Sequence, residues 1–214
     1  MHKQSKRPLL YENVVEEQVN QRQVIIDTII EWSSSSLTTN DFLQKVVDIL
    51  KDEYLFNFVG LFLLNSETQF LDIRAGTGRA GQLMLQHQYR WHLSKNKSLV
   101  SECFIRNAVC IDMLFSKPFE GFFYGPLSSD VNDKNIQPFT FVETFFSPAP
   151  DIGETEERMI IPLRTHQGVL GTIEFHSLAV DMGRNTAHFI LPVVDCIAEV
   201  CLKKMKQEYG KYYE

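Results

Sequence analysis

Hydrophobic residues recur at helical spacing near both ends of the chain. Residues 9–32 lack Gly and Pro, and their apolar positions fall near one face among Glu, Gln and Arg. A second apolar stripe repeats at i, i+3, i+4, i+7 and i+8 from Ile190 to Met205, where Pro192 fits only in the first turn or as a kink. We therefore predict a long amphipathic helix at each end. The inner stripe of the first helix is expected at Val15, Val19, Ile26 and Ile29, and a second apolar surface at Val14, Ile25, Ile30 and Val200.

Two shorter helices are marked by capping residues. Thr38, with Asp41 three residues on, resembles a capping box and predicts a helix that ends near residue 51. Ser98 predicts the start of another helix, which Asn107 closes.

Apolar runs without helical spacing predict the strands of a sheet. The run at 56–64 is continuously apolar, which is typical of a strand covered on both faces. A short helix is expected at 80–88. Further strands are expected at residues 70–75, 89–93, 108–112, 158–165 and 169–177.

The segment 113–157 has a different composition from the rest of the chain. It holds half of the 16 Phe residues, together with several Pro residues. A long connection without regular periodicity is typical of a lid or a binding loop, and its aromatic content disfavours disorder. We expect a Phe-rich lid here.

Composition and charge narrow the class of protein. The chain has 214 residues, 44% of them hydrophobic, and a net charge of −6, which indicates one globular core and disfavours nucleic acid as a partner. No run reaches the ~20 apolar residues of a membrane helix, and the start of the chain lacks a hydrophobic signal core. We expect a cytoplasmic protein that does not contact a membrane.

The four cysteines form no C-x-x-C pair and are expected to be reduced and buried.

The order of these elements and two stretches of sequence resemble the GAF domain family. Residues 99–112 resemble its helix-to-strand segment, although Ser101 and Asn107 stand where the family usually has Gly. Residues 158–177 resemble its strand ending in V-P-L, followed by a Gly turn and V-x-G-x-L-x-x-x-S. In this second stretch Gly168 permits the turn and Gly171 allows close approach of two backbones.

The resemblance implies an α+β, PAS-related fold. Its central antiparallel sheet has five to six strands, the terminal helices lie on one face, and a ligand cavity lies under a long lid on the other. The implied organisation is an N-terminal dimerisation helix at 1–32, a GAF core at 33–183 with its lid at 113–157, and a C-terminal helix at 184–214 that packs with the N-terminal one.

GAF domains are sensors of cyclic nucleotides, bilins, haem or small metabolites. The sequence argues against some of these ligands and leaves others open. Residues 148–156 have no cysteine to hold a bilin, and residues 132–143 have the wrong spacing for the cyclic-nucleotide motif. Haem needs an axial ligand, for which His87, His92 and His176 are candidates. The cofactor stays unknown, with haem and cyclic nucleotide as open alternatives. Free methionine sulfoxide reductases share the fold but use cysteines under the lid, so we expect no enzyme and no catalytic or metal-binding residues.

The candidate ligand site lies along the last strand. Thr172, Glu174 and His176 alternate with Ile173 and Phe175 and therefore point to the opposite face of the sheet. If that face is the cavity floor, Glu174 would receive a ligand amine or amide. The alternative is a cross-strand ion pair of Glu174 with Arg158 or Arg164. The full set of predicted ligand-binding residues is Tyr89, Trp91, Cys103, Phe104, Phe139, Phe141, Thr172, Glu174 and His176.

The sequence thus predicts a stand-alone GAF-type sensor. It would bind a small, partly apolar ligand non-covalently under the Phe-rich lid, form a homodimer through its terminal helices, and signal to a separate protein. The alternative is a ligand-free dimerisation or scaffold module whose lid fills the pocket with its own side chains.

Overall fold

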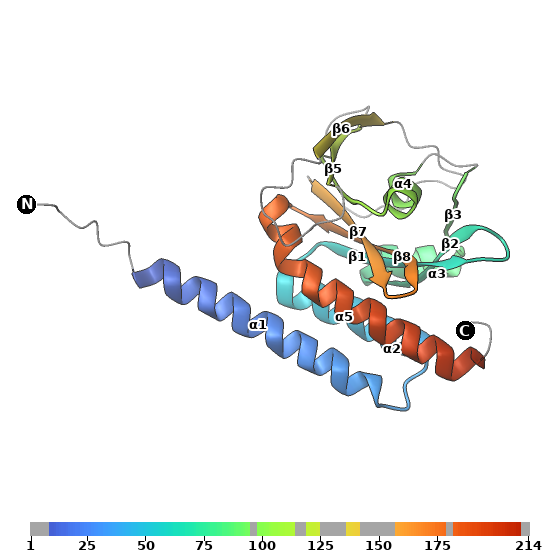
Figure 1. Ribbon diagram of the computed structural model, residues 1–214, viewed down its shortest axis with the longest axis horizontal. Coiled ribbons are helices and arrows are strands. Elements are labelled where there is room, and N and C mark those ends of the chain that lie inside the picture. The colour runs from blue at the N-terminus through green and yellow to red at the C-terminus, as the bar shows by residue number, and fades with distance from the viewer. Residues whose placement is uncertain are drawn as a thin grey trace, which may run out of the picture.

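The computed structural model is an antiparallel sheet between two layers of helices (Figure 1). It describes residues 9–94, 98–113, 119–124, 136–141, 157–178 and 182–210, and describes side chains for residues 18–94, 98–112, 157–178, 182–183 and 185–210. The helices in these residues are α1 (Leu9–Ser33), α2 (Thr39–Tyr54), α3 (Gly78–Gln86), α4 (Leu99–Arg106) and α5 (Arg184–Tyr209). The strands are β1 (Phe58–Asn65), β2 (Phe70–Gly76), β3 (Arg90–His92), β4 (Val109–Met113), β5 (Phe119–Tyr124), β6 (Ile136–Phe141), β7 (Glu157–Thr165) and β8 (Gly168–Ser177).

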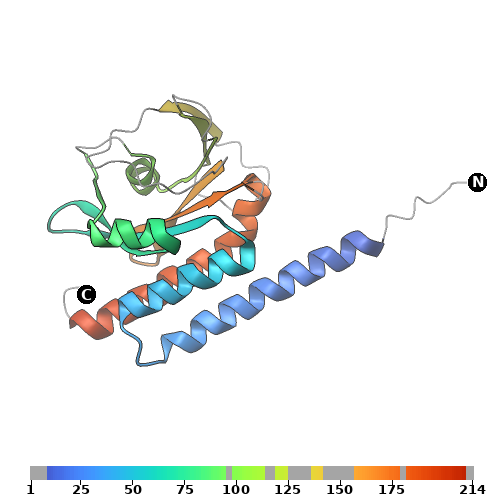
Figure 2. The same ribbon diagram turned by 180° about the vertical axis from the view of Figure 1, so that it is seen from behind.

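The strands form one sheet in the order β3-β2-β1-β8-β7-β4-β5-β6, and every neighbouring pair is antiparallel. The hairpin β7–β8 therefore lies at the centre, although it comes late in the chain. Its strands pair with β4 and β1, which are far away in sequence. In both views α4 lies between the β3 end and the β5–β6 end of the sheet (Figures 1 and 2).

The antiparallel α+β architecture is confirmed, but the described residues contribute eight strands to the sheet where we expect five or six. The additional pair, β5 and β6, lies inside the segment 113–157, which we had expected to be a loop. Both strands are rich in aromatic residues, which favour extended backbone. Pro138 is compatible with β6 because β6 is the outermost strand of the sheet, where a missing backbone donor is tolerated.

The first face of the sheet is covered by α2 and α5, and α1 packs against these two helices, mainly α5, on their outer side (Figure 2). The apolar core between them includes Ile161 and Ile173 from the central strands and Val194 and Ile197 from α5. The predicted stripe of α1 was wrong in part, because Val19 is 41% exposed whereas Ile25 is buried beside Ile29. The side chains of Val14 and Val15 lie outside the described residues.

Helix α5 is long and apolar enough to span a membrane over Asn185–Tyr209, but half of the most apolar window is buried inside the protein. Helices with this burial occur in the cores of globular proteins. The helix begins before the predicted stripe, so Pro192 lies in its interior. The proline ring cannot donate the usual bond to the carbonyl one turn earlier.

Capping residues determine several helix ends as expected. The Asp41 N–H donates to Thr38 Oγ1 at 3.1 Å, and the Ser101 N–H donates to Ser98 Oγ at 3.2 Å. Asn107 ends α4 in the left-handed conformation, with φ 48° and ψ 44°. Asparagine tolerates this conformation better than most residues, which explains how it can stand at a position where the family usually has Gly.

Gly171 allows β8 to approach β1 closely. A Cβ atom at this position would lie 1.9 Å from the carbonyl oxygen of Phe62. That separation is far below any contact distance, so a side chain here would push the two backbones apart. The expectation of a close backbone approach at Gly171 is confirmed.

A buried lysine near the end of α5 is hydrogen-bonded to the connection between α1 and α2. Lys204 is 2% exposed, and its ammonium donates to the carbonyl oxygens of Ser35 at 3.2 Å and Leu37 at 3.0 Å. One turn later, Glu208 Oε1 accepts the Thr39 N–H at 2.5 Å. These contacts fix where α2 starts relative to α5.

We predict that Lys204→Met lowers the free energy of unfolding by about 1–3 kcal/mol, because two carbonyl groups lose their buried donor. The matched control is Lys203→Met, since Lys203 is the exposed neighbour on the same helix. Urea denaturation measures both variants. Equal losses in the two would show that the buried contacts contribute nothing specific.

Candidate functional site

The second face of the sheet carries a buried row of polar side chains on β8. Thr172, Glu174 and His176 are 0%, 5% and 3% exposed, respectively. Their partners in β1 are Phe62, Gly60 and Phe58, in that order. The two Phe side chains belong to the apolar cluster on the α3–α4 side of the sheet. The intervening Ile173 and Phe175 pack in the core of the first face. The predicted alternation along this strand is therefore confirmed.

Strand register brings two further charged residues to this row. Arg158 in β7 pairs in register with His176, and Asp112 in β4 pairs with Arg158. Three neighbouring strands thus each contribute a charged side chain to one patch of the sheet. Gly60 pairs with Glu174 across the two strands. The Phe58 ring occupies the space that a side chain at Gly60 would need, since a Cβ there would lie 2.8 Å from the ring.

The Arg158 guanidinium connects two carboxylates. Its Nε donates to Asp112 Oδ1 at 3.0 Å and its Nη2 donates to Asp112 Oδ2 at 2.8 Å, a bidentate pair. Its Nη1 lies 3.4 Å from Glu174 Oε1, at the long end of hydrogen-bond distances. The three side chains are at most 6% exposed. The alternative of a cross-strand pair between Arg158 and Glu174 is therefore present in the structure, but as part of a buried network.

His176 completes the network from the other side of Glu174. Its Nε2 lies 2.9 Å from Glu174 Oε1, and the Phe58 ring meets the imidazole edge-on, with 5.4 Å between centroids. Burial by itself raises the pKa of the Glu174 carboxyl. The charge and hydrogen bond of His176, followed by those of Arg158, more than offset this effect, so the net pKa lies below its ordinary value of 4.5. Glu174 is therefore a carboxylate in the folded protein.

Two polar atoms of this row have no hydrogen-bond partner among the described residues. They are Thr172 Oγ1 and His176 Nδ1, and both are buried. Buried polar groups in native proteins are nearly always paired, because an unpaired one costs about 1–3 kcal/mol. An unpartnered hydroxyl and an unpartnered imidazole nitrogen in one row are the feature that best marks a ligand site.

The predicted residues of α4 and β3 lie on the same side of the sheet. Trp91 and Cys103 are buried in one cluster with Phe58 and Phe62, and Tyr89 and Phe104 pack at its margin, partly exposed. Phe139 and Phe141 belong to β6, but their side chains lie outside the described residues. The structure thus gathers seven of the nine predicted residues on one side of the sheet, and leaves the direction of the other two undescribed.

Cys103 has a structural role in α4. Its thiol donates to the carbonyl oxygens of Ala108 at 2.9 Å and Ile160 at 3.4 Å, and so joins the helix to the strand below. Burial strongly raises the pKa of this thiol. A protonated thiol that is hydrogen-bonded to two carbonyl groups is a poor nucleophile, because the reactive form of cysteine is the thiolate.

Asp112 is the site residue that sequence reasoning missed, and Arg158 was considered only as a partner of Glu174. Asp112 ends the helix-to-strand segment of the GAF resemblance, and Arg158 begins the most recognisable stretch. A charged residue inside an otherwise apolar strand was the available signal. Their pairing depends on the register between β4 and β7, which local pattern does not determine.

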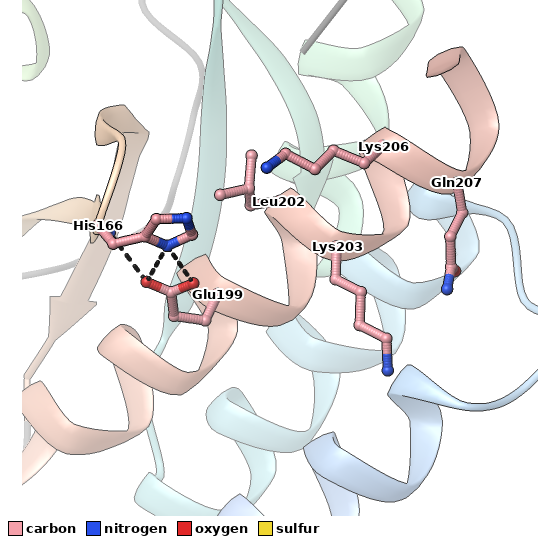
Figure 3. A pocket seen from close by; sticks show the side chains of 6 residues that line it. All are labelled: His166, Glu199, Leu202, Lys203, Lys206 and Gln207. Carbon is pink, nitrogen blue, oxygen red and sulfur yellow. Dashed lines mark hydrogen bonds and ion pairs between the residues drawn. The ribbon is translucent and has the colours of Figure 1, made fainter. Parts of the chain in front are cut away.

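Two open pockets lie elsewhere on the described surface. One, of about 350 Å³, lies between the β7–β8 turn and α5, where the His166 N–H donates to Glu199 Oε1 at 3.0 Å and His166 Nδ1 lies 3.1 Å from Oε2 (Figure 3). The other, of about 400 Å³, lies between α1, the end of α2 and the start of α5. Neither contains a predicted site residue. Among the described residues, no group of three or more His, Cys, Asp or Glu side chains is placed to hold a metal ion.

Comparison with solved structures identifies the fold. The GAF domain of an Acinetobacter phosphoenolpyruvate-protein phosphotransferase superposes with a TM-score of 0.59 and 13% identity, over 88% of this chain and 96% of that one. A phycocyanobilin-bound GAF domain from a cyanobacterial phytochrome gives 0.62 and 9%, over 88% and 97%. Free methionine-R-sulfoxide reductase from Neisseria meningitidis, in complex with its substrate, gives 0.56 and 9%, over 87% and 91%.

The chain therefore has the GAF fold, as its sequence resemblance implied. No family model and no curated protein sequence matches it. At sequence identities this low, the similarity shows the fold and does not identify a ligand.

We predict that Arg158→Met lowers the free energy of unfolding by about 3–5 kcal/mol, because it leaves the Asp112 carboxylate buried without its partner. Arg106→Met is the matched control, since Arg106 forms an exposed ion pair with Glu102 and its loss should cost less than about 1 kcal/mol. Urea denaturation measures both. A loss in Arg158→Met no larger than in the control would contradict the buried network.

The pKa of Glu174 predicts a dependence of stability on pH. Because this pKa is lower in the folded protein than the ordinary 4.5, the carboxylate stabilises the fold above that pH, and this contribution is lost as the pH falls through the folded value. The difference in unfolding free energy between wild type and Glu174→Gln should therefore shrink on acidification below 4.5. Chemical denaturation across a pH series checks this, and a difference that grows on acidification would show the opposite sign.

Proposed function

We propose that this protein is a GAF-type sensor that binds a small molecule non-covalently on the α3–α4 side of its sheet. The observation that carries the proposal is the buried row on β8, in which Thr172 Oγ1 and His176 Nδ1 have no partner among the described residues. A ligand that bonds to both atoms would remove two unfavourable desolvation terms at once. The surrounding cluster, with Phe58, Phe62 and Trp91, supplies the apolar wall that such sites usually have.

The proposed role is binding without catalysis. Cys103 is the one thiol among the predicted site residues, and it is buried, protonated and hydrogen-bonded to two carbonyl groups. The Arg158 and Glu174 charges are engaged with each other and with Asp112 and His176. This arrangement suits recognition of a ligand more than activation of a reacting group.

The central hairpin offers a route from the site to the terminal helices. At one end it carries Arg158, Glu174 and His176. Further along, Arg164 donates to the Oδ1 and the carbonyl oxygen of Asn107 at 2.6 and 2.8 Å, so the hairpin is tied to the end of α4. Its turn is tied to α5 through His166 and Glu199 (Figure 3). A ligand that shifts β8 would thus act on α5, and we propose that a separate signalling protein reads the change.

The proposed homodimer uses the terminal helices. Helix α1 extends beyond the rest of the molecule at its N-terminal end (Figure 1). On its described part Val19, Val24 and Ile30 are 41%, 64% and 50% exposed. Pairing of α1 with a second copy would cover such residues.

Native mass spectrometry on protein purified from its own host tests the proposal. We expect a dimer with a mass excess that disappears on denaturation, and an absorption spectrum identifies any coloured ligand. Added back at about 100 times its Kd, a ligand should stabilise the fold by about 2.7 kcal/mol, or raise the Tm by about 5–10 °C. In Thr172→Val, which removes the hydroxyl at similar volume, this shift should be smaller.

A different result would favour the scaffold role. A dimer without bound mass, whose Tm does not respond to a metabolite library, would contradict the sensor function. The terminal helices would then carry the function of the protein.

A further inference from the structure

Two lysines without a carboxylate partner lie on one face of α5. They are Lys203 and Lys206, and both line the pocket of about 350 Å³ between α5 and the β7–β8 turn. Lys203 is exposed and contacts the Ser33 hydroxyl at 3.5 Å, whereas Lys206 is partly buried. Among the described residues neither ammonium forms an ion pair. Like charges three positions apart on a helix repel each other, so an added negative charge would stabilise this face.

The carboxylate nearest in sequence is engaged elsewhere. A glutamate four residues before a lysine usually pairs with it, and Glu199 stands in this position relative to Lys203. The Glu199 side chain instead points to the β7–β8 turn, where it accepts the His166 N–H at 3.0 Å and lies 3.1 Å from Nδ1 (Figure 3). The pocket therefore has two ammonium groups without a carboxylate and one carboxylate that is already bonded.

The α5 helix itself keeps this arrangement in place. Lys206 lies in its last turn, where the negative end of the helix dipole stabilises a cation without any acidic partner. Leu202, one turn earlier on the same face, is 3% exposed and anchors the helix in the core. The lysines are thus presented on a rigid element and need no rearrangement before they bind.

The directions of the two ammonium groups indicate the size of the partner. Figure 3 shows Lys206 extending past Leu202 toward the β7–β8 turn, whereas Lys203 points the other way, toward the side where it contacts Ser33 of α1. One small anion would therefore contact a single ammonium. An exposed ion pair contributes less than about 1 kcal/mol, so stable binding needs several negative charges on one chain.

We infer that this face of α5, with the β7–β8 turn beside it, is a docking surface for an acidic segment of a partner protein, in which successive Asp or Glu side chains pair with Lys206 and Lys203. The inference rests on the proposed function, because it gives the chemistry of the separate signalling protein. Glu199 joins the turn to α5 at this same surface, so a segment that lies across both would detect a shift of the hairpin relative to the helix.

Three fluorescent oligomers test the inference on the full chain: hexaglutamate, hexalysine and a six-nucleotide oligothymidylate. Binding is measured by fluorescence anisotropy at neutral pH and about 50 mM NaCl. We expect saturable binding of hexaglutamate with a Kd below about 1 mM, at least fivefold weaker at about 300 mM NaCl because salt screens exposed charges. No binding of hexaglutamate, or equal binding of hexalysine, would overturn the inference. Tighter binding of the oligothymidylate would assign the surface to a phosphate backbone and overturn it as well.

Charge-reversal variants assign the binding to this surface. Lys203→Glu combined with Lys206→Glu should weaken hexaglutamate at least tenfold, because two attractive pairs become repulsive. Lys51→Glu is the matched control: Lys51 lies in the last turn of α2, whose first residue is the one beside Glu208 at the end of α5, and its change should alter the Kd less than twofold. Equal effects in the two proteins would show attraction by overall charge and overturn the inference. Lys206→Gln alone should weaken binding about threefold, and it replaces the double variant if that variant does not fold.

The outcomes for this surface and for the sensor are separate. A retained small molecule in a protein that does not bind hexaglutamate would overturn the docking surface and leave the sensor intact. Binding that the double variant loses, in a protein without any retained ligand, would support the docking surface and contradict the sensor. A ligand whose addition also changes the Kd for hexaglutamate would support both.

Discussion

The buried guanidinium of Arg158 is the interaction on which the inner face of this sheet depends. It joins β4 to β7 through Asp112 and reaches β8 through Glu174. Each of these strands is covered on both faces, so water does not stabilise the charges, and they stabilise one another only if the register is correct. The network therefore favours one alignment of three strands, and the same alignment places Thr172 and His176 where their unpartnered atoms lie in one row.

The two faces of the sheet have different chemistry, and β8 shows this most clearly. Ile173 and Phe175 lie in the apolar core under α2 and α5, and the alternate residues face the α4 side with polar groups. The core of the first face is mainly apolar, so burying it leaves few polar groups that need a partner. The second face also has an apolar cluster, but it includes polar groups that the described residues satisfy incompletely. The two sides of one strand thus combine apolar packing with a buried polar row.

Local pattern predicted most elements, because capping and side-chain alternation act over a few residues. Thr38, Ser98 and Asn107 mark helix ends for reasons that are visible in the sequence. The pairing of Asp112 with Arg158 could not be derived, since it joins residues 46 positions apart through strand register. The aromatic strands β5 and β6 were missed because a Phe-rich segment with prolines also fits a loop. On α1 the stripe was misplaced, since the helix meets α5 along a line that its own sequence does not specify.

The close passage at Gly171 has a consequence for how this protein can diverge. A Cβ there would meet the Phe62 carbonyl oxygen at 1.9 Å, so β1 and β8 stay in contact only while position 171 has no side chain. If the strands instead slipped by one residue, every side chain of β8 would exchange faces, and Glu174 would enter the apolar core. Position 171 therefore has to stay glycine while the sheet keeps this pairing, whereas the side chains at neighbouring positions of β8 are not restricted in this way.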